Sequence, residues 1–149
     1  MSPGVHYWQL SRALVSRRSK RKSHCGIKLS LLSAAAMHSF PQPALALVAE
    51  MEKAAAADPS RAVSFQGAPG CNGHRAALEY APDCLPLPCF SFEDALDAVK
   101  EGKAAKAIIP IENSQHGRVA DIHFLLPESG LYIVAEHFLR ISHALMALA

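Results

Sequence analysis

The stretch AIIPIENSQHGRV, from Ala107 to Val119, joins an apolar run to an unbroken row of polar residues. The run has the apolar, β-branched composition of a buried strand that ends at Pro110. The row that follows consists of Glu112, Asn113, Ser114, Gln115 and His116 before Gly117. In sheets flanked by helices, ligands bind beyond the carboxyl ends of the strands. The stretch therefore predicts a strand whose tip holds a small polar ligand.

A second strand with a polar loop precedes it. RAVSFQG predicts a buried strand over residues 62–65, and three glycines then stand three residues apart, at Gly67, Gly70 and Gly73, before a helical pattern from His74. Such a loop can aim backbone N–H groups at an anion, or the glycines can serve only a tight turn. The spacing matches neither the dinucleotide fingerprint nor a P-loop. We expect both polar loops to lie at the same edge of the sheet.

The remaining segments continue the alternation of strands and helices. CLPLPC predicts a strand near a sheet edge, and SFEDALDAVKEGKA predicts a helix that starts with a capping box between Ser91 and Asp94. Residues 119–126 predict a helix that Pro127 stops. Its inward face comprises Val119, Ile122, Phe124, Leu125 and Leu126. Leu131 onward alternates as one or two strands. The fold class is therefore α/β, a mostly parallel sheet with crossover helices.

The charge of the chain is divided unevenly along its 149 residues. Residues 1–49 carry seven Lys/Arg and no acids, whereas residues 50–149 carry eight Lys/Arg against 13 Asp/Glu, a formal charge of −5. The acidic part is not typical of nucleic-acid binders, and no apolar stretch reaches membrane-spanning length. The cysteines, Cys25, Cys71, Cys84 and Cys89, form no C-x-x-C pair. This pattern favours reduced thiols in a cytoplasmic protein without a metal site.

We expect residues 1–60 to form a basic extension, disordered or foreign to the natural protein, with a helix near residues 43–57, and residues 61–149 to form the folded domain. The basic cluster runs from Arg17 to Lys22 and precedes a serine-interrupted apolar stretch. Three interpretations remain open: a secretory signal cleaved near Ala36, an organelle transit peptide, or a segment before a natural start at Met37.

Three segments resemble the N-terminal half of bacterial prephenate dehydratases. They are VSFQGAPG with the following HRAA, FSFEDALDAVKEGKA, and AIIPIENSQHGRVADIHFLLPESGLYIVAEHF. The resemblance covers Ala62 to Ala149, and P-I-E-N-S with Gly117 and Val119 after it is specific to that family. Family members carry a Tyr-Ser pair where this chain has Asn72 and Gly73. The resemblance identifies residues 61–149 with a truncated prephenate dehydratase catalytic domain.

The resemblance implies the first lobe of a two-lobe fold similar to type II periplasmic binding proteins. It implies conversion of prephenate to phenylpyruvate, with loss of water and CO2, in phenylalanine biosynthesis, without metal or cofactor and with homodimers in full-length relatives. The family's Thr-Arg-Phe motif and its phenylalanine-binding ACT domain have no counterpart here. We therefore expect this fragment to have little activity by itself.

The catalytic candidates are Glu112, Asn113 and Ser114, and the substrate-binding candidates are Gly70, Asn72, Gly73, His74 and Gln115. Backbone N–H groups from Gly70 to Gly73 would hold one carboxylate of prephenate. Asn113 and Ser114 would hydrogen-bond the ring hydroxyl or the other carboxylate, although capping the next helix is an alternative role. We expect Glu112 to fix the loop rather than donate a proton, because a further negative charge opposes binding of a dianion.

Two other functions remain open. A non-catalytic lobe that binds small anions would use the same architecture and would fit an exported protein. Arogenate dehydratase would fit an organelle-targeted relative, and the sequence does not decide between arogenate and prephenate.

Overall fold

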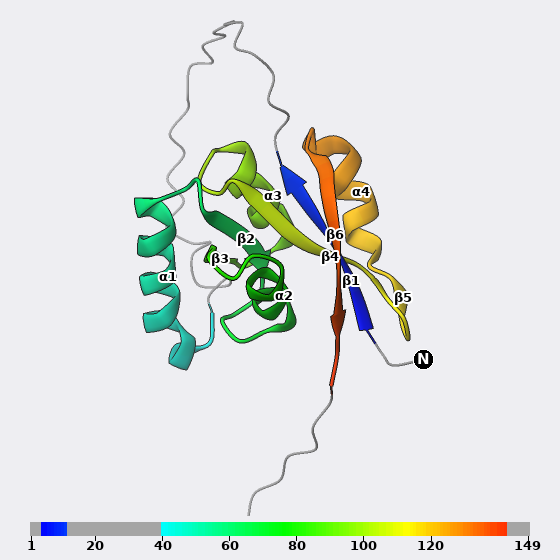
Figure 1. Ribbon diagram of the computed structural model, residues 1–149, viewed down its shortest axis with the longest axis horizontal. Helices are drawn as coiled ribbons and strands as arrows, with labels where there is room; N and C mark the ends of the chain where they lie inside the picture. The colour runs from blue at the N-terminus through cyan, green and yellow to red at the C-terminus, as the bar shows by residue number, and fades with distance from the viewer. Residues whose placement is uncertain (1–3, 12–39, 143–149) are drawn as a thin grey trace, which may run out of the picture.

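The structure is a computed structural model that describes residues 4–11 and 40–142 (Figure 1). Along the chain the described elements are β1 (Gly4–Ser11), a 3-10 turn (Gln42–Ala44), α1 (Leu45–Ala57), β2 (Ala62–Gln66), α2 (Asn72–Tyr80), β3 (Leu85–Cys89), α3 (Phe92–Lys100), β4 (Lys106–Asn113), β5 (Gly117–Arg118), α4 (Ala120–Ser129) and β6 (Tyr132–Arg140). Strands alternate with helices as the sequence predicts, which confirms the α/β class. Within the described ranges, no helix is long and apolar enough to cross a membrane.

The strands form one sheet in the order β3-β2-β4-β1-β6, and the short β5 pairs with β4. Strand β2 is parallel to both β3 and β4, whereas β1 is antiparallel to both β4 and β6. Strands β2, β3, β4 and β6 therefore all point the same way. The predicted mostly parallel sheet is confirmed, with β1 as a reversed strand inside it.

Strand β1 shows that Gly4–Ser11, expected to belong to a disordered or foreign extension, is an ordered part of the sheet. Gly4–Ser11 lies between β4 and β6 and pairs with both along its length. The physical reason is its composition, because apolar side chains point to both faces, as a central strand requires. Tyr7 is 3% exposed and Leu10 is fully buried. The basic cluster and Met37 lie outside the described residues.

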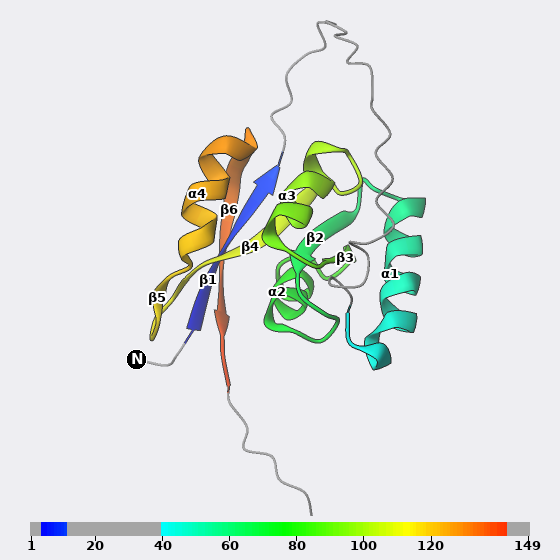
Figure 2. The ribbon, with the colours of Figure 1, turned by 180° about the vertical axis from the view of Figure 1, so that it is seen from behind.

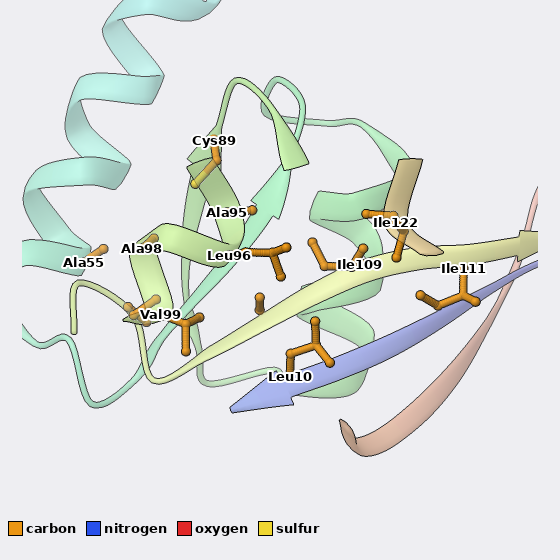
Figure 3. Packing of buried hydrophobic residues seen from close by; sticks show 13 residues of the cluster. Leu10, Ala55, Cys89, Ala95, Leu96, Ala98, Val99, Ile109, Ile111 and Ile122 are labelled. Carbon is orange, nitrogen blue, oxygen red and sulfur yellow. The ribbon is translucent and has the colours of Figure 1, made fainter. Parts of the chain in front are cut away.

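Two apolar cores fill the two faces of the sheet. The core on the side of α3 and α4 includes Leu10, Leu96, Val99, Ile109, Ile111 and Ile122 (Figure 3). The core on the side of α2 includes Val5, Tyr7, Val63, Phe65, Ile108 and Leu139. Helices α1 and α4 lie at opposite ends of the sheet (Figures 1 and 2), α1 against β3 and α4 against β4 and α3. Strand β1 thus contributes side chains to both cores.

The start of α3 and the edge strand β3 agree with the sequence predictions. The Ser91 hydroxyl accepts a hydrogen bond from the Asp94 N–H at 3.1 Å, and the Asp94 carboxylate accepts one from the Ser91 N–H at 3.0 Å. This reciprocal pair is the predicted capping box. Among the described strands, β3 pairs only with β2, and an edge position leaves room for Pro86 and Pro88, which lack N–H donors.

Helix α4 differs from its prediction in two ways. Pro127 does not stop it, since the helix runs to Ser129 and ends at Gly130, which has a left-handed φ of 67°. The Ser129 hydroxyl donates to the Leu126 carbonyl at 2.7 Å, so a side chain supplies a hydrogen bond in the last turn. Phe124, expected to face inward, is 78% exposed.

Candidate functional site

The polar row after the apolar run forms a β-hairpin. Strand β4 continues through Pro110 to Asn113, so the expectation that the strand ends at Pro110 is wrong. Pairing between β4 and β2 stops at Ile108, which places Pro110 where β4 has left that neighbour. Gly117 closes the three-residue turn with a φ of 75°, a left-handed conformation that hairpin loops of this length use.

Asn113 stabilises this turn. Its side-chain Oδ1 accepts a hydrogen bond from the Gln115 N–H at 2.9 Å, the geometry of an Asx turn. The N-cap of α4 is Val119, without a side-chain hydrogen bond, so Asn113 does not cap that helix. The Asn113 amide NH2 remains as a donor, and Gln115 itself is exposed at the hairpin tip.

Ser114 is fixed by the first residue of β1. The Gly4 N–H donates to the Ser114 hydroxyl oxygen at 3.0 Å, and the Ser114 N–H donates to the Gly4 carbonyl at 3.0 Å. Ser114 therefore does not cap α4 either. Its hydroxyl hydrogen is still able to donate to a ligand.

A β-bulge at Ile111 decides which way Asn113 and Glu112 face. Val5 pairs with Asn113 and His6 with Glu112, but Tyr7 pairs with Pro110, so Ile111 is the extra residue. Directly opposed residues share a face of the sheet, and Val5 belongs to the core under α2. The bulge therefore turns Asn113 toward the α2 face and Glu112 toward the other. Bulges commonly redirect side chains next to functional sites.

Most backbone donors of the glycine loop are already used. The Gly67 N–H donates to the Cys89 carbonyl at 2.9 Å, and the Cys71 N–H donates to the Ala68 carbonyl at 3.1 Å. The Gly70 N–H donates to His74 Nδ1 at 2.9 Å, so this donor is already paired within the loop. The described N–H groups that remain include those of the first turn of α2, where a helix leaves its donors unpaired.

His74 is a structural residue of the loop. Its ring stacks on Phe65 with centroids 5.3 Å apart, and its Nδ1 accepts the Gly70 hydrogen bond. Burial lowers the pKa of His74 below its ordinary value, which keeps Nδ1 unprotonated and able to accept. The ring and Nδ1 of His74 therefore help to fix the conformation of the loop.

Each glycine of the loop has a structural reason. Gly67 and Gly70 have positive φ angles of 115° and 90°, which other residues adopt at a cost. A Cβ on Gly73 would lie 3.1 Å from the Gln66 carbonyl oxygen. Gly67 and Gly70 thus serve the tight turn, whereas Gly73 allows the close approach of α2 to the end of β2.

A hollow of about 380 Å³ lies at this end of α2, within the usual size range of small-molecule sites. Its lining residues are Tyr7, Gln66, Gly67, Cys71, Asn72, Gly73 and Pro110. Two of the predicted substrate-binding residues, Asn72 and Gly73, are among them. The hollow therefore joins the glycine loop to β4 and, through Tyr7, to β1.

The two polar loops lie at the same edge of the sheet, as predicted, but at different heights. Phe65 pairs with Ile108, so Gly67 is level with Pro110 and Asn113 lies three residues further along. At roughly 3.3 Å per residue this offset is about 10 Å. The hairpin donors therefore lie beyond the hollow rather than directly across it.

Tyr7 is the site residue that the sequence analysis missed. It lines the hollow, and burial raises the pKa of its phenol well above the ordinary value, with Cys71 raising it further and Arg75 opposing the shift. The period-2 alternation of GVHYWQLS was a usable signal for a strand. Nothing in that segment indicated that it would reach a loop more than sixty positions away.

The described residues contain no group of three or more His, Cys, Asp or Glu side chains that could hold a metal ion. Cys71, Cys84 and Cys89 are free thiols. Burial raises the pKa of Cys89 to about 12, so this thiol is protonated and unreactive at neutral pH.

Comparisons with known proteins agree with the motifs. The family model described as prephenate dehydratase matches residues 63–149, more than half of the chain. A bifunctional N-acyl-homoserine lactone acylase/prephenate dehydratase from Komagataeibacter europaeus is 46% identical over 88 residues, 59% of this chain and 31% of that protein. The chloroplastic arogenate dehydratase/prephenate dehydratase 1 of Arabidopsis thaliana is 42% identical over 56% of this chain and 21% of its own length. Arogenate dehydratase 1 of Petunia hybrida is 40% identical over 58% and 20%. The chain thus spans between a fifth and a third of the length of these relatives.

Proposed function

Because this chain belongs to the prephenate dehydratase family, we propose that it forms the part of a dehydratase that binds prephenate. The dehydratase would be a lyase that converts prephenate to phenylpyruvate. The observation that carries the proposal is the hollow between the first turn of α2 and β1, together with the family-specific hairpin that follows β4. The hollow lies where ligands bind in sheets of this kind.

The chemistry of the reaction suits a site built from donors. Prephenate is a dianion that carries a ring hydroxyl. The C–O bond breaks, the hydroxyl leaves with a proton as water, and the electron pair of the breaking C–CO2 bond completes the aromatic ring. Aromatisation drives the reaction, so the protein needs mainly to hold the two carboxylates and to assist departure of the hydroxyl.

The described residues divide these tasks. The unpaired N–H groups in the first turn of α2 would bind one carboxylate, helped by the positive end of the helix dipole. The Asn113 amide and the Ser114 hydroxyl would donate to the ring hydroxyl or to the second carboxylate. Glu112 would fix the hairpin, since the bulge turns it to the opposite face, and Gln115 would contact the ligand from the hairpin tip.

We expect the chain to bind prephenate but to convert it to phenylpyruvate only slowly. None of the described residues that line the hollow has a carboxyl or imidazole side chain, and protonation of a departing hydroxyl needs an acid within hydrogen-bond reach. The relatives contain sequence beyond the region that they share with this chain, and that sequence would supply the missing acid.

Several finer assignments belong to the same proposal. The alternation of parallel strands and helices supports the first lobe of a periplasmic-binding-like fold. Free thiols at the described cysteines support a cytoplasmic location. Tyr132, Val134 and Phe138 are about half exposed on the edge strand β6, which supports a homodimer or domain contact there.

Arogenate is the second candidate substrate, because the plant relatives are named for it. Arogenate carries an ammonium group where prephenate carries a keto oxygen. A site made of N–H and O–H donors would favour the keto compound, since a donor facing an ammonium is unpaired. Calorimetric titration with each compound separates the two candidates. Tighter binding of arogenate than of prephenate would identify arogenate as the substrate.

The decisive experiment measures prephenate binding by titration calorimetry, and phenylpyruvate formation with and without the remaining part of a full-length relative. The key variant is Asn113→Asp, because its carboxylate still accepts from the Gln115 N–H but replaces a donor with a negative charge. We expect at least tenfold weaker binding. Gln42→Glu is the matched control, since it makes the same change at an exposed position before α1. Absence of prephenate binding by the parent chain would refute the proposal.

A further inference from the structure

Strand β1 lies outside the family-matched region, which begins at residue 63, yet it forms one wall of the candidate site. Tyr7 pairs with Pro110 of β4 on one side and with His137 of β6 on the other. Its side chain belongs to the core under α2 and lines the hollow. The register therefore fixes this phenol at the level of the glycine loop.

The other lining residues leave few side-chain donors for a ligand. The Gln66 amide donates to the Phe90 carbonyl at 3.3 Å, and the Cys71 thiol contacts the Gln66 carbonyl at 3.6 Å. Pro110 has no N–H, and glycine has no side chain. Among the described residues that line the hollow, Tyr7 and Asn72 are therefore the side chains whose donors make no hydrogen bond, and Gln66 keeps one of its two amide N–H donors.

The Tyr7 hydroxyl is suited to donate to an anion. Burial raises the pKa of its phenol, so the group is neutral at physiological pH and keeps its proton. A neutral hydroxyl in the hollow that also borders the unpaired N–H groups of α2 can donate a further hydrogen bond to a bound carboxylate, without adding a charge to the site. Hydrogen bonds to charged acceptors are stronger than those between neutral groups.

The bulge at Ile111 lies immediately beyond Tyr7. It shifts the β1–β4 register between His6 and Tyr7. Asn113 therefore lies on the α2 face, as Tyr7 does, although it is three residues after Pro110, the partner of Tyr7. The phenol thus stands between the first turn of α2 and the hairpin donors, on the path that a ligand reaching both would occupy.

We infer that Tyr7, delivered by the N-terminal strand, is a ligand-binding residue whose hydroxyl donates a hydrogen bond to a carboxylate held at the first turn of α2. The inference rests on the proposed function for its natural ligand, prephenate, but it applies to any small dicarboxylate that the hollow admits. Tyr7 thereby supplies a hydroxyl next to Asn72 and Gly73, the positions at which the resemblance indicates a departure from the family's hydroxyl-bearing pair.

The test compares the full chain with Tyr7→Phe, which removes the hydroxyl and keeps the buried ring. Tyr132→Phe is the matched control, because Tyr132 is 59% exposed on β6. Prephenate and malonate are titrated into each protein, and binding is followed by calorimetry and by the amide NMR signals of Asn72 and Gly73. Thermal unfolding verifies that the three proteins are equally folded. We expect Tyr7→Phe to weaken binding about tenfold and Tyr132→Phe to leave it unchanged.

The outcomes separate this inference from the proposed function. Prephenate binding that is equal in parent and Tyr7→Phe overturns the role of Tyr7 and leaves the proposed function in place. Malonate binding that depends on Tyr7, without prephenate binding, supports the role of Tyr7 and overturns prephenate as the ligand. Absence of binding by both compounds overturns both.

Discussion

Replacing Leu10 by alanine tests whether β1 belongs to the sheet. Leu10 is fully buried in the core on the side of α3 and α4, and the substitution removes three carbon atoms from that core. At about 0.8 kcal/mol per buried methylene the transfer loss is roughly 2.4 kcal/mol. The cavity that remains adds to this loss, so we expect about 3 kcal/mol in total.

Urea unfolding followed by far-UV circular dichroism measures the loss. With a urea dependence of about 2 kcal/mol per molar, the midpoint should fall by roughly 1.5 M. Leu47→Ala is the control, because Leu47 is 47% exposed on α1 and its truncation should change the free energy of unfolding by less than about 0.5 kcal/mol. Hydrogen exchange of residues 4–11 gives a second readout. Equal midpoints for parent and Leu10→Ala, with rapid exchange of β1, would show that the strand is detached and would also remove Tyr7 from the site.

Three further predictions concern local structure. Ser91→Ala removes one half of the capping box and should destabilise the chain by about 1 kcal/mol, measured by urea unfolding, whereas Ser91→Asp should restore most of the loss. Gly117→Ala places a Cβ at a φ of 75° and should cost roughly 1 kcal/mol, more than Gly117→Asn, and equal stabilities would contradict the left-handed turn. Burial lowers the pKa of His74, so on acidification the unfolded chain takes up a proton before the folded chain does. The stability that His74 contributes is therefore full above its ordinary pKa of about 6.5 and is lost as the pH falls below that value. We expect the melting temperature of His74→Phe to fall less than that of the parent between pH 7.5 and 5.5.

Local signals predicted the elements that depend on local physics. The capping box at Ser91 determines where α3 begins, and its hydrogen bonds join residues only three positions apart. The prolines of β3 exclude a central position for that strand. Gly67 and Gly70 in the loop after β2 follow from backbone conformation alone, since both have positive φ angles. Such features are readable from the sequence because the interacting groups are neighbours in the chain.

The features that the sequence did not reveal depend on distant partners. Pro127 remains inside α4 although proline ordinarily interrupts a helix. Gly4–Ser11 precedes a basic segment, and that segment directed the prediction toward an extension rather than a strand. The place of this strand between β4 and β6 depends on pairing with residues 106–113 and 132–140. The direction of Asn113 depends on a bulge, which a period-2 pattern cannot show.

These two distant effects together determine what the site can do. Without β1, the gap between β4 and β6 would leave Ser114 without the Gly4 hydrogen bonds and the hollow without the Tyr7 wall. Without the bulge, the alternation of β4 would turn Asn113 to the face opposite α2. In the proposed site, the positions of the Ser114 and Tyr7 hydroxyls therefore depend on β1 being paired in this register. A one-residue slip of β1 would move Tyr7 to the other face, so substitutions that disturb β1 should weaken ligand binding even where they lie far from the hollow.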